Sequence, residues 1–351
     1  MGPKITNLKF EIRNSQLPCR GFVLVIVLCT IMLLEVLLLG FNFRCRTNLR
    51  AVDHLRRSQE ALNCARAGLN IAIAAIKDNA DIYSDKGLVN LLSGQNCVTV
   101  GAGECLITVT QESSKLNVNL LKDKNGKLDR SRIDQLLRLI DLLNRERAGE
   151  SAIGYGLVPS IIDWTDDDDD VTCLPFVTRE NLGVESDYYS TLDPAYRCKN
   201  KPLETVEEML LIKGITADIF ERIRNYVTVN GDGKVNLNSA PKLVIESLSE
   251  KMDAAVAQMV VDRQKVRPFE SVAELRDVPG MTDSIYEAIK NAVTVSVEDQ
   301  YYRVASRADS RLRGNDVTPA QAGVGCAIDA VLRRNPETKT VEVVFYTEHP
   351  R

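Results

Sequence analysis

The longest hydrophobic pattern lies near the N-terminus. A polar stretch with four basic side chains precedes the apolar run Phe22–Phe41, FVLVIVLCTIMLLEVLLLGF, in which Glu35 is the one charge. A helix needs about 20 apolar residues to cross a bilayer, whereas a cleavable secretory signal has only roughly 7–15. The pattern predicts a transmembrane helix, and a plain signal anchor is the simplest protein of that kind.

The helical pattern continues beyond the apolar run. Leu55, Leu62, Leu69 and Ile76 recur every seven residues, and no proline interrupts 22–79. Recurrence of apolar residues at this spacing is typical of an amphipathic helix. The sequence therefore predicts one helix, or two nearly coaxial ones, with a spanning half and an amphipathic half.

Two groups of segments alternate apolar and polar residues, as strands with one buried face do. Strands are expected at 97–100, 105–109 and 116–120, and again at 301–308, 324–334 and 340–347. The stretch between the two groups, 128–300, has a helical pattern. The predicted fold class is α+β, with a long N-terminal transmembrane and amphipathic helix, a small antiparallel sheet, and a large all-helical insertion.

The insertion contains an internal repeat. PLETVEEMLLIKGITADIFERIRNYVTV begins at Pro202, and PFESVAELRDVPGMTDSIYEAIKNAVTV begins at Pro268. The offset aligns Gly214 with Gly280, and a shorter echo links KLNVNL with KVNLNS. The repeat predicts two helix–turn–helix units, at about 202–229 and 268–295, each with a glycine in its turn.

Each unit resembles a helix-hairpin-helix. In DNA-binding versions, the turn and nearby basic residues hold a phosphate. Here Asp218 and Asp283 place negative charge beside the turns, so packing within the protein is favoured over binding of nucleic acid. The net charge of -4 also argues against a nucleic-acid-binding protein.

The chain carries little catalytic chemistry. It has two histidines, and no P-loop, H-E-x-x-H or G-x-S-x-G motif occurs. The aspartates that follow Trp164 are too numerous to imply a tuned acid–base pair. The sequence therefore predicts a protein that is not an enzyme.

Nine cysteines occur, none in a C-x-x-C pair, which disfavours a zinc or thioredoxin-type site. Cys97 and Cys105 lie symmetrically about a glycine turn and would face each other in a hairpin. Cys173 and Cys198 bracket the segment that follows the acidic run. We predict a disulfide in at least one of these pairs, which requires an oxidising compartment such as a periplasm.

A short basic leader, Gly21-Phe22 and a long helix together resemble the type IV pilins and type II secretion pseudopilins. The resemblance implies that prepilin peptidase cleaves between Gly21 and Phe22 and methylates the new N-terminus. Position five of the mature chain is Ile26, where most members have glutamate. That departure is characteristic of the K-type minor pseudopilin, which has a pilin-like fold with a helical domain inserted among its strands.

Four motifs extend this resemblance over almost the whole chain. They are DWTDDD at Asp163, GVESDYY at Gly183, KVNLNSAP at Lys234 and YYRVASR at Tyr301. Family members tend to have a second acid where this chain has Ser186.

The resemblance implies a single-pass protein of the bacterial inner membrane with its C-terminal domain in the periplasm. It would join the I- and J-type minor pseudopilins and the major pseudopilin at the pseudopilus tip, initiating assembly and supporting export of folded proteins. The heptad face around Leu55, Leu62 and Leu69 is expected to contact these partners. The alternative is a membrane-anchored helix-hairpin-helix DNA-binding protein of a DNA-uptake system.

Five adjacent aspartates, Asp166–Asp170, repel one another unless water or a cation compensates them. A solvated acidic loop is one interpretation. The K-type family binds calcium in this domain, and calcium takes six to eight oxygen ligands. The expected structural calcium ligands are therefore Asp166, Asp168, Glu185 and Asp187.

The expected organisation is a leader, a spanning helix, its amphipathic continuation, the first part of a pilin-like β domain, the helical insertion and the C-terminal strands. The corresponding boundaries are 1–21, 22–43, 44–80, 81–127, 128–300 and 301–351.

Overall fold

The computed structural model forms two compact units, Met1–Gln59 and Glu60–Arg351. The predicted leader lies almost wholly outside the described residues. The structure describes residues 20–78, 97–100, 103–123, 125–146, 152–295, 300–309, 325–335 and 338–350.

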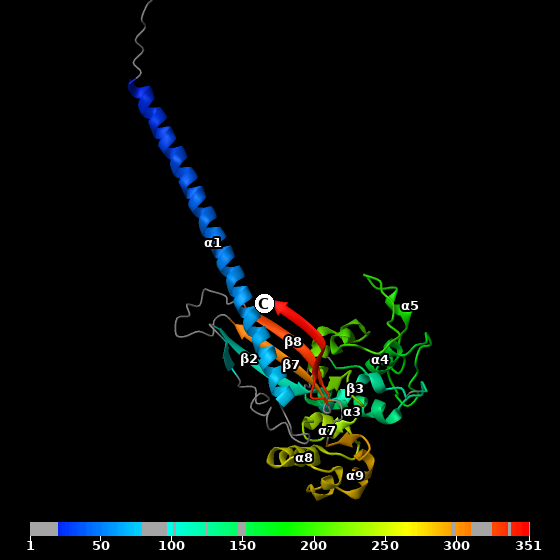
Figure 1. Cartoon of the computed structure of the whole chain (residues 1–351). Helices are drawn as coiled ribbons and strands as arrows, with labels where there is room; N and C mark the ends of the chain where they lie inside the picture. The colour runs from blue at the N-terminus through cyan, green and yellow to red at the C-terminus, as the bar shows by residue number, and fades with distance from the viewer. Residues whose placement is uncertain are drawn as a thin grey trace, which may run out of the picture. The chain divides into compact units, whose positions relative to one another are not determined.

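Helix α1, Arg20–Asp78, is continuous over 59 residues (Figure 1). Its first part leaves large apolar side chains exposed, such as Phe22 at 68% and Leu39 at 70%. From Phe22 onward the helix is long and apolar enough to cross a membrane. The prediction of a long apolar N-terminal helix is confirmed.

The C-terminal part of α1 packs on the sheet through one buried face. Ala65, Leu69 and Ala72 are buried in a core shared with the strands. A Cβ added at Gly68 would collide with Ser306 Oγ and lie 2.9 Å from Cys105 Sγ. The absence of a side chain at Gly68 thus lets the helix backbone approach the sheet closely. Because Leu69 is only 6% exposed, the expectation that it contacts partner subunits is wrong.

Five strands form one antiparallel sheet with the order β1-β2-β7-β8-β9. Their bounds are Cys97–Val100, Gly103–Gln111, Gln300–Asp309, Gly325–Arg334 and Val341–Pro350. β2 and β7 are neighbours although the insertion separates them in sequence (Figure 1). The insertion therefore occupies the place that a hairpin turn would have between these two strands.

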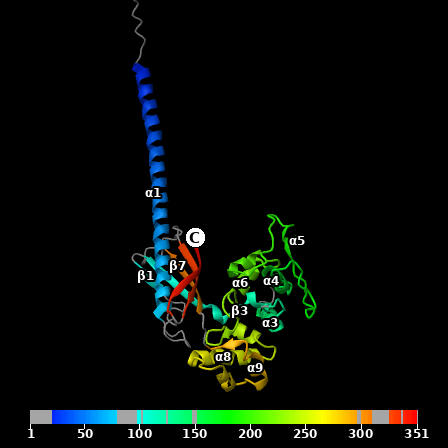
Figure 2. The ribbon, with the colours of Figure 1, turned by 45° about the vertical axis from the view of Figure 1, so that its right-hand side comes forward.

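The insertion has its own core, which extends from Leu116 to Val295. Figure 2 shows its green to orange elements grouped together. Its α-helices are α3 Arg130–Glu146, α4 Leu157–Thr165, α5 Ser186–Tyr189, α6 Ala217–Ile223, α7 Lys242–Ser247, α8 Ala254–Val266 and α9 Asp283–Ile289. Its 3₁₀-helices are η1 Glu112–Ser114, η2 Val118–Leu120, η3 Val206–Leu211 and η4 Val272–Asp277.

The sequence predicted an all-helical insertion, but the insertion also contains short strands. β3, Leu116–Asn117, pairs in parallel with β4, Val227–Thr228, and β5, Val235–Asn236, pairs in parallel with β6, Val293–Thr294. Residues 116–120 therefore do not form a third strand of the main sheet. Only two of them are extended, and they pack in the core of the insertion, ahead of the expected boundary at 128.

Two stretches of the insertion share one local geometry at the offset found in the sequence. η3, Gly214 and α6 are followed by β4, and η4, Gly280 and α9 are followed by β6. Both glycines have φ +86°, a conformation that a side chain would strain. The hydroxyls of Thr216 and Thr282 then cap the two helices by accepting backbone N–H groups.

In each stretch, an asparagine from a preceding segment hydrogen-bonds to two backbone carbonyls at equivalent positions. The Asn119 amide donates to the carbonyls of Leu203 and Val229, at 2.9 and 3.0 Å. The Asn238 amide donates to those of Phe269 and Val295, at 3.0 and 3.2 Å, the positions 66 residues later. The KLNVNL and KVNLNS segments therefore each place an asparagine where it satisfies buried backbone groups.

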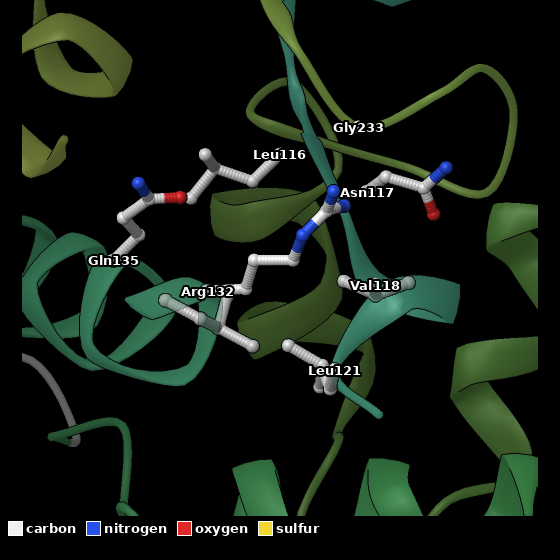
Figure 3. Close-up of a pocket in the computed structure, with 8 residues that line it drawn as sticks. Leu116, Asn117, Val118, Leu121, Arg132, Gln135 and Gly233 are labelled. Atoms are coloured by element: carbon white, nitrogen blue, oxygen red, sulfur yellow. The ribbon is translucent and has the colours of Figure 1, made fainter. Parts of the chain in front are cut away.

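A small pocket lies between β3, α3 and the turn at Gly233 (Figure 3). Figure 3 shows Arg132 extending from α3 toward Asn117 and Gly233. The Arg132 Nε atom lies 3.2 Å from Asp129 Oδ2, and the guanidinium donates to the Asp232 carbonyl at 3.4 Å. Arg132 lines this pocket and contacts only groups of the insertion in these two interactions, so we assign the pocket to the packing of the insertion.

Arg303 on β7 joins the sheet to the insertion. Its guanidinium lies 3.4 Å from Glu112 Oε1 and 2.7 Å from Glu207 Oε1. Lys115 Nζ lies 2.5 Å from the same oxygen of Glu112. Glu112 is fully buried and the Arg303 side chain is only 13% exposed, so these charges depend on one another.

Arg303→Met should lower the free energy of unfolding by about 3 kcal/mol, because the fully buried carboxylate of Glu112 then keeps only Lys115 and the partly exposed carboxylate of Glu207 loses its ion pair. Arg66 makes an exposed ion pair with Glu348 at 2.8 Å, and Arg66→Met is the matched control, which should change stability little. Urea unfolding of the detergent-solubilised chain measures both. Equal effects of the two substitutions would contradict the role assigned to Arg303.

Candidate functional site

The acidic cluster forms where α4 ends. The helix buries Trp164 and with it carries Asp163 into the interior, and Asp166 then adopts an extended conformation that stops the helix. Asp166, Asp168 and Glu185 each place a carboxylate oxygen within 4.8 Å of the other two. Two segments that are distant in sequence therefore meet through their carboxylates.

Several oxygens of this cluster lack a hydrogen-bond donor among the described residues. Asp163 is fully buried, and its Oδ1 accepts the Thr172 backbone N–H at 2.9 Å while its Oδ2 has no partner. Both carboxylate oxygens of Glu185 and Oδ1 of Asp166 are also unpartnered. Buried polar atoms without partners are costly unless a proton or a cation satisfies them.

Lys122 supplies positive charge at one side of the cluster. Its Nζ bonds to Asp166 Oδ2 and lies 3.7 Å from Asp168 Oδ2. One ammonium group cannot neutralise these two carboxylates together with those of Asp163 and Glu185. The cluster therefore keeps excess negative charge when all four carboxyl groups are ionised.

Burial raises the pKa of Asp163 to about 6. Burial, and then the nearby carboxylates of Asp163 and Asp166, raise the pKa of Glu185 to about 8. Without a cation, Glu185 is thus held mostly protonated at neutral pH. The unpartnered oxygens and the clustered carboxylates fit a hard divalent cation such as calcium, which binds through oxygen and favours the ionised forms.

Neighbouring side chains hold the cluster in place. The Asn200 amide donates to the Asp168 carbonyl at 2.9 Å and to Asp169 Oδ1 at 3.0 Å. The Trp164 ring packs edge-on against Tyr189, with ring centroids 5.0 Å apart. The first contacts tie the acidic run to the segment at Asn200, and the ring contact ties α5 to α4.

The structure brings three of the four predicted ligands together and adds groups that sequence reasoning missed. Asp187 is exposed on α5 and lies outside the cluster. Asp163, Lys122 and Asn200 were not predicted. A signal for Asp163 existed, since it precedes Asp166 by three residues and helical residues at that spacing are neighbours.

Other predicted site residues behave as follows. Gly21 and Phe22 lie near the start of α1, and Phe22 is exposed. Asp123 and Asp232 were not predicted as ligands, and each lies in an ordinary turn in which its carboxylate accepts nearby backbone N–H groups at 2.8–3.0 Å.

The cysteine pairs depart from expectation. The register pairs Cys97 with Leu106 and Cys105 with Val98, so the expectation that the two cysteines lie opposite each other is wrong by one position. Cys173 and Cys198 are both free thiols in the structure. The symmetric placement about the turn had suggested a register that the hairpin does not adopt.

Comparisons with known proteins locate the chain in one family. Two family models, both described as type II secretion system (T2SS), protein K, match residues 114–232 and 235–296. Together they cover just over half of the chain, and they divide close to the boundary between the two repeated stretches. The chain belongs to the type II secretion system protein K family.

Similar proteins of this family include those of Klebsiella pneumoniae and Pseudomonas aeruginosa, at 26% and 28% identity over 40% and 48% of this chain. The chain spans 40% and 47%, less than half, of the length of these two relatives. The protein K of Aeromonas hydrophila is 22% identical, over 84% of this chain and 90% of its own length.

The fold is similar to a chain in the crystal structure of the GspK-GspI-GspJ complex from the enterotoxigenic Escherichia coli type 2 secretion system. The TM-score is 0.57 at 18% identity, over 87% of this chain and 99% of that chain. The predicted relationship to K-type pseudopilins is confirmed. The comparisons give no support to the DNA-uptake alternative.

Gly183 constrains the site and can be tested directly. A Cβ there would collide with Asp163 Oδ2 and lie 2.7 Å from the Pro159 carbonyl oxygen, which belongs to the backbone of α4. Gly183→Ala should therefore lower the free energy of unfolding by about 1–3 kcal/mol.

Gly154→Ala is the matched control, because the added methyl would meet only the flexible side chain of Glu180. Its effect should stay within about 0.5 kcal/mol. Thermal unfolding of both variants measures the difference. A Gly183→Ala variant as stable as the control would show that the backbone at the site gives way easily.

Proposed function

We propose that this chain is a minor pseudopilin that assembles with I- and J-type partners at the tip of the pseudopilus and supports export of folded proteins. One observation supports this function most directly. A large helical domain is inserted between adjacent strands of a small sheet that packs on an amphipathic, membrane-anchored helix. The chain of similar fold was crystallised in a complex with GspI and GspJ, which suggests the same partners here.

The position at the tip follows from the size of the insertion. It comprises residues 112–299, between β2 and β7, and is therefore larger than the sheet that carries it. In a filament whose subunits stack through their N-terminal helices, each globular part must fit between neighbours. A subunit at the end of the filament has no neighbour on one side, so the added volume is tolerated there.

Maturation would remove the leader between Gly21 and Phe22, methylate the new N-terminus and place the globular part in the periplasm. Ile26, in the spanning part of α1, then occupies the fifth mature position. A carboxylate at that position would cost free energy in lipid unless a partner neutralised it. The first subunit of a filament has no earlier neighbour that could neutralise such a carboxylate. The apolar Ile26 at this position agrees with that placement.

The contact surface for partner helices lies on α1 just beyond the spanning run. Val52 and Leu55 are 63% and 64% exposed, and they lie on the apolar face that continues into the buried residues of the amphipathic part. Leu69 and Ile76 on that face are already covered by the sheet. The exposed part of the face is therefore available to neighbouring helices.

Leu55→Glu should reduce co-purification of the full-length chain with I- and J-type minor pseudopilins about tenfold or more, since it places a charge in an apolar helix contact. Val266→Glu is the matched control, because Val266 is an apolar residue, 86% exposed, on the insertion. Pull-down from detergent-solubilised membranes measures both, and N-terminal sequencing of the same material locates the cleavage. Equal recovery with both variants would contradict this contact.

We also propose that the acidic cluster binds calcium, which would stabilise the insertion. The ligands would be Asp166, Asp168, Glu185 and Asp163, with Lys122 moving aside or sharing the charge. The proposal is supported by the unpartnered oxygens of Asp163, Asp166 and Glu185 and by the separation of the two segments in sequence. An ion that binds only the folded form raises stability with its concentration, by about 2.7 kcal/mol at 100 times its Kd.

Calcium should raise the Tm of the wild-type chain above its value in chelator, and Glu185→Gln should abolish most of that rise. In chelator alone the same variant should be no less stable than the wild type, because the amide removes a buried carboxyl that its neighbours repel. Asp187→Asn should keep the full rise, since Asp187 lies outside the cluster. If calcium does not change the Tm of the wild type, the calcium proposal is wrong, and Lys122 alone compensates the charge of the cluster.

A further inference from the structure

Two cysteines from different elements meet in the core between α1 and the sheet. Cys64 on α1 is 4% exposed and Cys105 on β2 is fully buried. Both cysteines are free thiols in the structure, and their side chains hydrogen-bond to each other. The two thiols are therefore neighbours although the helix and the strand are separate elements.

The position of Gly68 gives independent geometric support. Gly68 follows Cys64 by one helical turn, so both residues lie on the same face of α1. A Cβ built at Gly68 would lie 2.9 Å from Cys105 Sγ. The sulfur of Cys105 thus points at the helical turn that begins with Cys64, and the missing side chain at Gly68 gives it room.

Other described cysteines are worse placed to react with Cys105. The register pairs Cys97 with Leu106. Cys326 lies two strands away, since Cys105 pairs with Ala308 on β7 and Ala308 pairs with Cys326 on β8. Two strand spacings are about 9–10 Å, beyond the Cα separation of roughly 7 Å that a disulfide can bridge.

We propose that Cys64 and Cys105 form a disulfide that joins α1 covalently to β2 in the mature protein. This inference rests on the proposed periplasmic location of the globular part, because disulfides persist in oxidising compartments. Each cysteine loses its thiol proton, and the pair gives two electrons to the disulfide of a protein thiol oxidase. That disulfide is broken and leaves the oxidase as two thiols, so one S–S bond forms for each one lost.

The burial of both thiols determines when the reaction occurs. Desolvation raises the pKa of Cys64, and a thiol rather than a thiolate reacts slowly. The oxidase therefore meets these cysteines before α1 has fully packed on the sheet. Packing then encloses the new bond, which protects it from reductants.

The disulfide would provide a covalent path for mechanical tension between α1 and the sheet. α1 carries the apolar spanning segment, and β2 leads directly into the insertion. A covalent link at Cys105 transmits tension from the helix to the sheet without relying on side-chain packing alone. It also closes the chain from Cys64 to Cys105, which restricts the unfolded state.

The test uses the full-length chain from membranes, alkylated under denaturing conditions before any reduction and then digested with protease. Mass spectrometry should find one peptide pair containing Cys64 and Cys105, two hydrogens lighter than the sum of the separate peptides. Cys64→Ser should make Cys105 accessible to the alkylating reagent, whereas the matched control Cys326→Ser should leave the pair linked. Reduction should lower the Tm of the wild type by roughly 5 °C and leave that of Cys64→Ser unchanged.

A second experiment tests the pairing of Cys64 with Cys105 independently of the proposed periplasmic location. Purified, reduced chain is partly unfolded in urea and refolded with oxidised glutathione. A Cys64–Cys105 link that forms only in this arm supports the pairing and contradicts the proposed periplasmic location. Full alkylation of both cysteines in the two arms, or a link from Cys105 to Cys97, would overturn the proposal.

Discussion

The pairing of β2 with β7 is the interaction on which the rest of the structure depends. It holds together the two ends of the insertion, from the pair Glu104–Asp309 to the pair Gln111–Tyr302. The entropy of closing a long loop grows only slowly with its length, so one ladder of strand hydrogen bonds can carry a whole domain. Arg303 lies within this ladder and contacts the carboxylates of Glu112 and Glu207 in the insertion, which joins the sheet to the domain it carries. The buried face of β2 packs on α1 at Gly68, so the same strand contacts both the long N-terminal helix and the strand β7 that follows the insertion.

Patterns that are local in sequence predicted the fold well. The apolar run, the period-two strands at both ends of the globular part, and the repeated glycine turns each correspond to an observed element, because the signal and the structure lie in the same residues. The failures concern partners that are distant in sequence. Leu116 and Asn117 have a strand pattern that does not reveal β4 as their partner. Cys97 and Cys105 lie on paired strands whose register their spacing does not reveal, and a change of one position separates them.

The acidic cluster shows the same division. The five aspartates and the acids near α5 identified the region, since unusual charge density is visible in sequence alone. Which carboxylates converge depends on α4, whose end turns Asp163 inward, and on α5, whose first turn leaves Asp187 in solvent. Lys122 approaches from a segment 44 residues earlier. An ion pair between residues so far apart in sequence leaves no local pattern. The sequence alone therefore could not show that the ammonium group of Lys122 supplies part of the positive charge that a bound cation would supply.

The location of the cluster follows from the difference between the two repeated stretches. In each, an asparagine reaches across a connection to the same backbone positions, but the first connection spans 84 residues from Asn119 to Leu203 and the second spans 31 from Asn238 to Phe269. The shorter connection contains little more than α7 and α8, which form part of the core of the insertion. The longer one contains α3, α4, α5 and an irregular chain, and ordering each irregular residue costs conformational entropy that helical packing does not offset. Trp164 supplies one internal anchor for this chain, and the converging carboxylates supply the other. Because like charges repel, these carboxylates can stabilise the chain only when positive charge holds them together, either from Lys122 or from the calcium ion that we propose.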